Sequence, residues 1–175
     1  MIKKVIQITS IFLFLTNFGY SAGSSGNDNQ DINKKNSVSS KIKKLSSFEL
    51  AEQKIEKAKK LDKKGKNKKA NKLYKSALKN LFKANKQKPF DPDILNYLGF
   101  THRKINKFED SEIYYLMGLE IDPNHVGINE YLGELYVSTN RLDLAKERLE
   151  ILKGCNCEEY QQLKDVIDGN KSSKY

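Results

Sequence analysis

The sequence predicts an all-α fold built from repeated helical hairpins, and two observations lead to this prediction. Landmarks around Gly99 recur 34 residues later around Gly133, and each of these glycines follows a leucine. Apolar residues along much of the chain recur at i, i+3 and i+4, the spacing of one face of an α-helix. A single helical hairpin cannot bury its own apolar face, so a period of this length indicates hairpins stacked into an α-solenoid.

The chain begins with the features of a secretory signal peptide. Two lysines precede an apolar run over residues 5–18, and small residues, among them Ser21 and Ala22, follow it. This run is shorter than the roughly 20 residues of a membrane span, although an uncleaved anchor is the alternative. We therefore expect residues 1–22 to be a signal peptide that is cleaved near Ser21–Ala22, and the protein to be exported.

Residues 23–45 have the composition of a linker. They are mostly glycine, serine, asparagine, aspartate, glutamine and lysine, with few apolar side chains. A segment of this kind cannot bury enough apolar surface to offset the loss of chain entropy, so we expect it to be a disordered polar and basic linker.

A divergent first hairpin is predicted over residues 46–91. Ser46 and Glu49 have the S-x-x-E spacing of a capping box at a helix start. Apolar residues of the second helix, expected over residues 68–87, keep the helical spacing throughout. The closing proline, Pro89, comes seven residues late in the 34-residue register, which corresponds to about two extra helical turns.

Two regular hairpins are predicted over residues 92–125 and 126–157. Asp91 before Pro92 combines an N-cap with proline at the first helical position. The glycine of each leucine-glycine pair should lie where the two helices of its own hairpin touch, because a small residue lets two backbones approach closely.

A last helix over residues 158–170 should cover the open end of the stack, as a terminal element of a repeat array must. It carries Leu163 and Val166 on one side. Asn156 and Glu159 repeat the capping-box spacing, so Asn156 is expected to be its N-cap.

The landmarks fall at the positions that define the tetratricopeptide repeat (TPR). With Leu98 and Gly99 at positions 7 and 8 of a 34-residue unit, Tyr115 falls at position 24 and Pro123 at position 32, as in the pattern W-x2-L-G-x2-Y…A-x3-F…P. The chain resembles the TPR family over roughly residues 92–157. The resemblance implies an α-solenoid of three TPR-like helical hairpins plus a C-terminal capping helix, and a protein that binds partners.

The two cysteines, Cys155 and Cys157, are separated by one residue. An even pair in an exported protein favours a disulfide, but so small a loop would stabilise little; free or intermolecular thiols, or a catalytic or metal role, are the alternatives. The chain is similar to small exported TPR proteins of Gram-negative bacteria that end in a paired-cysteine segment and C-E-E-Y-x-x-L, which residues 157–163 match. This similarity implies a periplasmic location.

In TPR proteins the first helices of the hairpins line a concave groove. Carried over by repeat position, the expected partner groove comprises Asn96, Phe100, Arg103, Lys104, Glu130 and Glu134. Phe100 and Arg103 lie three residues apart, so both should project to one side and anchor the partner. Such a groove would suit a protein or peptide of mixed charge. The alternative is that some of these side chains only contact the next hairpin.

Positive charge is concentrated in one part of the chain. Residues 41–88 contain 18 lysines and four carboxylates, a net charge of +14, whereas residues 89–175 have a net charge of −6. Six lysines follow one face of the long second helix: Lys68, Lys72, Lys75, Lys79, Lys83 and Lys86. This lysine face would suit an anionic membrane surface or cell-wall polymer, or be simply a solvated outer face. Nucleic acid is a poor candidate, because arginines are few and no aromatic platform separates the lysines.

No catalytic, cofactor or metal motif stands out in the sequence. It contains no glycine-rich phosphate loop, H-E-x-x-H or nucleophile elbow, and neither histidine has the spacing of a metal ligand. We therefore expect a non-enzymatic adaptor or scaffold without cofactor or metal. The alternatives are a basic docking module that uses the lysines of residues 57–88 and, more distantly, a thiol redox protein.

Overall fold

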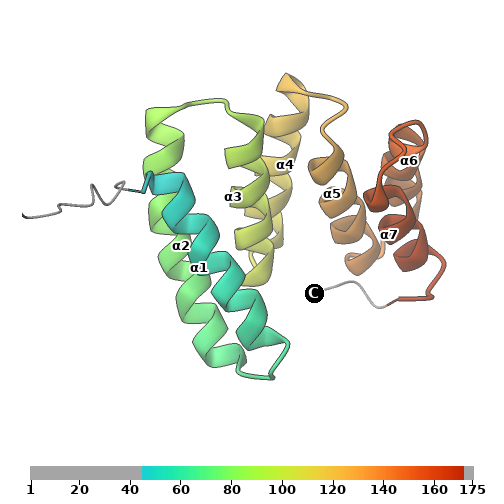
Figure 1. Ribbon diagram of the computed structural model, residues 1–175. Coiled ribbons are helices and arrows are strands. Elements are labelled where there is room, and N and C mark those ends of the chain that lie inside the picture. Colours follow the sequence, from blue (N-terminus) through green and yellow to red (C-terminus); the bar gives the residue numbers. More distant parts are fainter. Residues whose placement is uncertain (1–44, 172–175) are drawn as a thin grey trace, which may run out of the picture. The chain divides into compact units, whose positions relative to one another are not determined.

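The computed structural model describes residues 45–171, so the expected signal peptide and nearly all of the expected linker lie outside the described residues. The described residues form seven α-helices and no strand (Figure 1). The helices are α1 (Ser47–Asp62), α2 (Asn67–Gln87), α3 (Pro92–Lys104), α4 (Phe108–Ile121), α5 (Val126–Ser138), α6 (Leu142–Leu152) and α7 (Glu158–Ile167). The predicted all-α class is confirmed.

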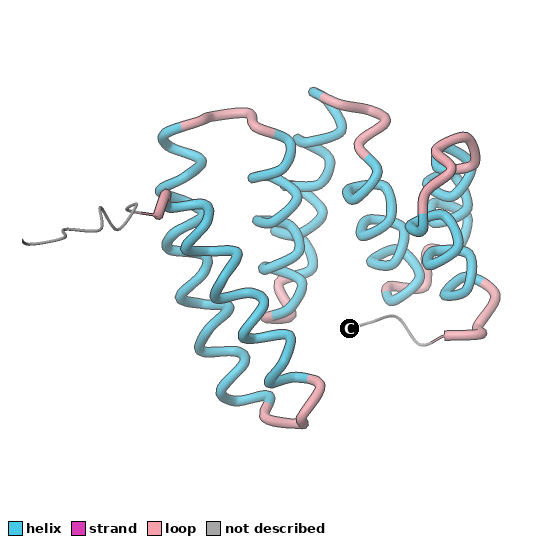
Figure 2. Tube along the Cα trace, viewed as in Figure 1, coloured by secondary structure: helices cyan, strands magenta, loops and turns pink. Residues whose placement is uncertain are grey.

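Consecutive helices pair into hairpins, which then pack on one another. α1 packs on α2, α3 on α4, and α5 on α6, each pair joined by a short turn (Figure 2). Contacts of α2 with α3 and of α4 with α5 join the hairpins, and α7 packs against α5 and α6. Within the described residues, no helix is both long and apolar enough to cross a membrane.

The same backbone turn joins the two helices of every hairpin. Gly65, Asn106 and Asn140 occupy equivalent places in the three turns and all have positive φ, at 67°, 61° and 59°. Glycine adopts this left-handed conformation without a Cβ clash, and asparagine tolerates it better than most residues. Asn106 and Asn140 are one 34-residue unit apart, whereas Gly65 precedes Asn106 by 41 residues. The difference of seven equals the extra length of α2, which has 21 residues against 14 in α4.

The starts of α1, α3 and α5 follow local capping rules, whereas those of α2, α4, α6 and α7 have no side-chain cap. Ser46 and Glu49 form the expected capping box, and Asp91 Oδ1 accepts from the Ile94 N–H at 3.2 Å. The prediction that Asn156 caps α7 is wrong, because Cys157 is the N-cap and no side chain bonds there. An N-cap residue has an extended backbone, whereas Asn156 has a φ of 49°.

The two glycines of the leucine-glycine pairs make different contacts. A Cβ added to Gly99 would lie 2.5 Å from the ring of Tyr115 on α4, the partner helix of the same hairpin, as expected. A Cβ added to Gly133 would instead lie 2.5 Å from Leu163 on α7, so the expected contact within its own hairpin is wrong.

The register of α7 explains this contact. Leu163 and Val166 lie 68 residues after Leu95 and Leu98 of α3, which is two full units, and all four are buried. α7 therefore occupies the place of a first helix in a fourth unit, and it covers the apolar surface of α5 that a further hairpin would bury.

Candidate functional site

The described residues form a groove of about 900 Å³, which we call the main groove. It extends from α1 and α2 past the α3–α4 turn to α5. Its lining residues are Glu56, Lys59, Asp62, Lys63, Asn67, Asn71, Tyr74, Lys104, Asn106 and Tyr131.

Charged groups in the main groove partly neutralise one another. Asp62 Oδ2 accepts from the Tyr74 hydroxyl and from Lys104 Nζ, both at 2.9 Å. Lys59 Nζ lies 3.0 Å from Glu56 Oε1. Burial and the neighbouring Asp62 raise the pKa of Tyr74 well above its usual value, so its neutral phenol is the donor. The groove therefore presents a polar surface on which positive and negative charges nearly cancel.

Three amide side chains provide hydrogen-bonding capacity in the main groove. Asn67 and Asn71 lie one turn apart on α2, and Asn106 lies in the α3–α4 turn. None of the three side chains makes a hydrogen bond to another described residue. Each amide can donate and accept, which is the pairing that an extended peptide backbone needs.

A smaller hollow of about 180 Å³, which we call the recess, lies between the first helices. Its lining residues are Lys59, Asn96, Tyr97, Phe100, Gly127, Glu130, Tyr131 and Glu159. The Phe100 and Tyr131 rings are 5.4 Å apart between centroids, and Lys59 Nζ lies 4.9 Å from the centroid of Phe100. Lys59 and Tyr131 also line the main groove, so the two features adjoin.

The six residues expected in the partner groove divide into three sets. Asn96, Phe100 and Glu130 line the recess, and Lys104 lines the main groove. Arg103 and Glu134 line neither feature.

Arg103 and Glu134 instead form a buried ion pair between α3 and α5. The side chains are only 2% and 0% exposed, and Arg103 Nη2 lies 3.0 Å from Glu134 Oε2. Arg103 Nη1 also donates to the carbonyl of Tyr131 at 3.0 Å. The expectation that Arg103 meets a partner together with Phe100 is therefore wrong, because adjacent first helices touch at these repeat positions. For this pair, the alternative therefore holds: the two side chains only contact the neighbouring hairpin.

Sequence reasoning missed the contribution of second helices and turns to the main groove. The repeat-position rule considers first helices alone, so it does not select Asn67 and Asn71 on α2 or Asn106 in a turn. The four-residue spacing of Asn67 and Asn71 was the available signal, because it places both amides on one side of the helix.

The lysine face lies on the exposed side of α2. All six of its lysines are exposed, and none forms an ion pair with another described residue. The face therefore presents unneutralised positive charge to its surroundings.

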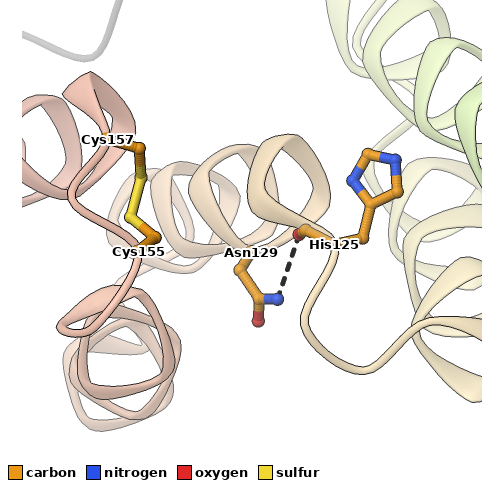
Figure 3. Close-up of a disulfide and its surroundings, with 4 residues drawn as sticks. All are labelled: His125, Asn129, Cys155 and Cys157. Atoms are coloured by element: carbon orange, nitrogen blue, oxygen red, sulfur yellow. Dashed lines mark hydrogen bonds between the residues drawn. A yellow bond between two sulfur atoms is a disulfide. The ribbon is translucent and has the colours of Figure 1, made fainter.

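The cysteines lie in the turn between α6 and α7, outside both the main groove and the recess. Cys155 and Cys157 form a disulfide, and Figure 3 shows this bond together with the Asn129–His125 hydrogen bond at the start of α5. Among the described residues, no group of three or more histidine, cysteine or acidic side chains could hold a metal ion.

The buried side chain of His102 contacts a backbone carbonyl and an aromatic ring, so it has a packing role. Its Nδ1 lies 2.8 Å from the carbonyl of Leu98, and its ring stacks on Tyr114 at 5.0 Å between centroids. Burial lowers the pKa of His102, so the neutral imidazole is favoured. It lines neither the main groove nor the recess.

Hairpins in a 34-residue register, the recurring left-handed turn and the close helix contact at Gly99 define a TPR-type α-solenoid. No protein-family model and no curated protein matches the sequence. Among solved structures, the first TPR of Spaghetti (RPAP3) bound to the HSP90 peptide SRMEEVD is 18% identical, with a TM-score of 0.45, over 71% of this chain and 95% of that chain.

Two structures of the Yersinia enterocolitica type III secretion chaperone SycD are also similar. SycD in complex with a peptide of the translocator YopD is 17% identical, with a TM-score of 0.43, over 67% of this chain and 86% of that one. A second structure, of the type III secretion translocator chaperone SycD, is 17% identical, with a TM-score of 0.44, over 74% of this chain and 88% of that one.

Proposed function

We propose that this protein is a non-enzymatic TPR adaptor that binds an extended peptide segment of a partner protein in the main groove. The observation that carries the proposal is the groove itself, about 900 Å³ in size and lined by side chains of nearly balanced charge. The three amides, of Asn67, Asn71 and Asn106, can form hydrogen bonds with the main chain of a peptide of any sequence. The lysines and carboxylates would select among its charged side chains.

A capture experiment with two matched variants tests this function. In the first, Asn67→Ala and Asn71→Ala remove two groove amides; in the second, Lys68→Ala and Lys72→Ala remove two lysines from the neighbouring exposed face of the same helix. Partners captured from envelope extract are identified by mass spectrometry, and the bound segment is then titrated as a synthetic peptide. We expect the asparagine variant to lose binding and the lysine variant to retain it. The opposite result would refute groove binding.

The lysine face supports a second candidate function, docking on an anionic membrane surface or cell-wall polymer. Its six lysines are exposed along a helix of 21 residues, about 32 Å long at 1.5 Å per residue. Sedimentation with vesicles rich in phosphatidylglycerol tests it. Binding should be strong at low salt and fade near physiological salt, where the Debye length is about 8 Å. No sedimentation at low salt would exclude this function.

Export to a bacterial periplasm completes the proposal. It is supported by the two lysines, the apolar run over residues 5–18 and the small residues after it. Intact-mass measurement of protein recovered from the envelope fraction should show that the chain begins near Ser21–Ala22. A cytosolic species that retains Met1 would contradict this location.

A further inference from the structure

The recess combines aromatic walls with an excess of negative charge. Glu130 and Glu159 line it, whereas Lys59 is its only lining cation among the described residues. Lys59 Nζ is also within 3.0 Å of Glu56 Oε1, so its charge is largely balanced from outside the recess. Lining charge alone therefore favours a cation over an anion in this hollow.

One cation, the ammonium group of Lys59, already lies over an aromatic ring of the recess. Lys59 Nζ lies 4.9 Å from the centroid of Phe100, within the distance at which a ring face attracts an ammonium group. Tyr97 and Tyr131 also line the recess. Burial, with Glu52 nearby, raises the pKa of Tyr97 well above its usual value, so its ring carries no charge of its own.

Asn96 contributes an acceptor without a partner. The residue is 8% exposed, and its Oδ1 is buried with no hydrogen-bond partner among the described residues. A buried amide oxygen of this kind costs free energy until a donor reaches it. Rotation of the side-chain amide would let an N–H donor in the recess satisfy it.

Acidic residues also collect at the edge of the stack where the recess lies. The first helices carry carboxylates in their N-terminal halves: Glu49 and Glu52 on α1, Asp93 on α3, Glu130 on α5, and Glu158 and Glu159 on α7. In the main groove, by contrast, Lys63 and Lys104 lie at the C-terminal ends of α1 and α3. A ligand that spans both features would therefore meet net negative charge in the recess and nearly balanced charge in the main groove.

We infer that the recess binds one cationic side chain, lysine or arginine, of the peptide held in the main groove. The inference rests on the proposed function and adds a specificity to it. The hollow of about 180 Å³ has room for a single long side chain. Bound there, the cation contacts ring faces and lies among the carboxylates, and its N–H groups reach Asn96. An organic cation is the ligand, because the described carboxylates, histidines and cysteines form no cluster suited to a metal ion.

Two peptides that differ only in charge test the inference on the full chain. One is a short glycine-serine peptide with a central arginine, and its twin has citrulline, which has the same shape but no charge. Binding is measured by NMR titration of the amide signals of Phe100, Tyr131 and Glu159. The arginine peptide should bind at least about threefold more tightly, the effect of one partly exposed charge pair.

Matched variants show where that preference arises. Glu159→Gln should remove most of the difference between the two peptides, whereas Glu158→Gln, the same charge change one residue away and outside the recess, should leave it in place. Lys59→Gln should increase the preference for arginine, because the resident cation no longer competes. Circular dichroism of each variant verifies the fold.

The outcomes separate this inference from the proposed function. If both peptides shift the groove signals with equal affinity and Glu159→Gln changes neither, the recess does not select a cation, although the main groove still binds peptide. If neither peptide shifts any groove or recess signal, peptide binding itself fails and the inference fails with it.

Discussion

Replacing Arg103 by methionine should destabilise the fold strongly, although the sequence alone places this residue in a binding surface. The substitution keeps an unbranched apolar stem and removes the guanidinium, so the carboxylate of Glu134, which is 0% exposed, loses a charged partner 3.0 Å away. The Tyr131 carbonyl loses a donor at 3.0 Å as well. Removal of one partner from a buried ion pair costs about 3–5 kcal/mol. For a domain of this size, that loss lowers the melting temperature by roughly 10 °C or more.

Urea unfolding followed by far-ultraviolet circular dichroism measures this loss. Lys107→Met is the matched control, because Lys107 pairs with Asp110 at 3.2 Å with side chains 58% and 47% exposed, and such a pair contributes only about 0–1 kcal/mol. Adding Glu134→Leu to Arg103→Met should recover much of the stability, since no charge then remains buried. If Arg103→Met costs no more than Lys107→Met, the buried pair does not exist in solution.

Three further predictions follow from the structure. Gly99→Ala should lower the unfolding free energy by about 1–3 kcal/mol, because the new methyl group overlaps a buried tyrosine ring. Gly154→Ala, which has open space around it, should leave the unfolding free energy unchanged in the same urea assay. If the two variants lose the same stability, the close contact between Gly99 and the tyrosine ring is contradicted. His102 should make the fold less stable as pH falls through about 6.5, because burial lowers its folded-state pKa and the unfolded chain then binds more protons. His102→Phe should flatten that slope, and an unchanged slope would assign it to other groups. Cys155→Ser with Cys157→Ser should cost no more than about 1.6 kcal/mol, the chain-entropy value for a three-residue loop, and a larger loss in melting experiments would show that the bond positions α7.

Most features governed by local chain chemistry were predictable from the sequence, although the capping-box spacing at Asn156 did not form a cap. The capping box at Ser46, the proline after Asp91 and the 34-residue register each depend on residues a few positions apart or on a strict repeat. The length of α2 followed from the same register, because a late proline moves the helix end and leaves the turn at Gly65 unchanged. Local signals of this type survive folding, since neighbours in sequence remain neighbours in space.

Features that depend on which helices meet were not predictable from position alone. Repeat rules place Arg103 and Glu134 toward a groove, but adjacent first helices approach closely enough here to bury both. A signal was present, because the two residues carry opposite charge on consecutive first helices. Similarly, Gly133 contacts Leu163 because α7 continues the register of the first helices. The leucine and valine of α7, two units after Leu95 and Leu98, could have indicated this.

The burial of the Arg103–Glu134 pair also determines where binding chemistry can lie. Since these side chains join α3 to α5 and are buried, they are not accessible to a ligand, and the main groove is lined in part by α2 and the α3–α4 turn. α2 has two distinct faces, because Asn67 and Asn71 line the groove while Lys68 and Lys72 lie on its exposed lysine face. One residue along a helix is a rotation of about 100°, at 3.6 residues per turn. Paired substitutions one position apart on this helix therefore distinguish a peptide-binding adaptor from a surface-docking module without changing the fold.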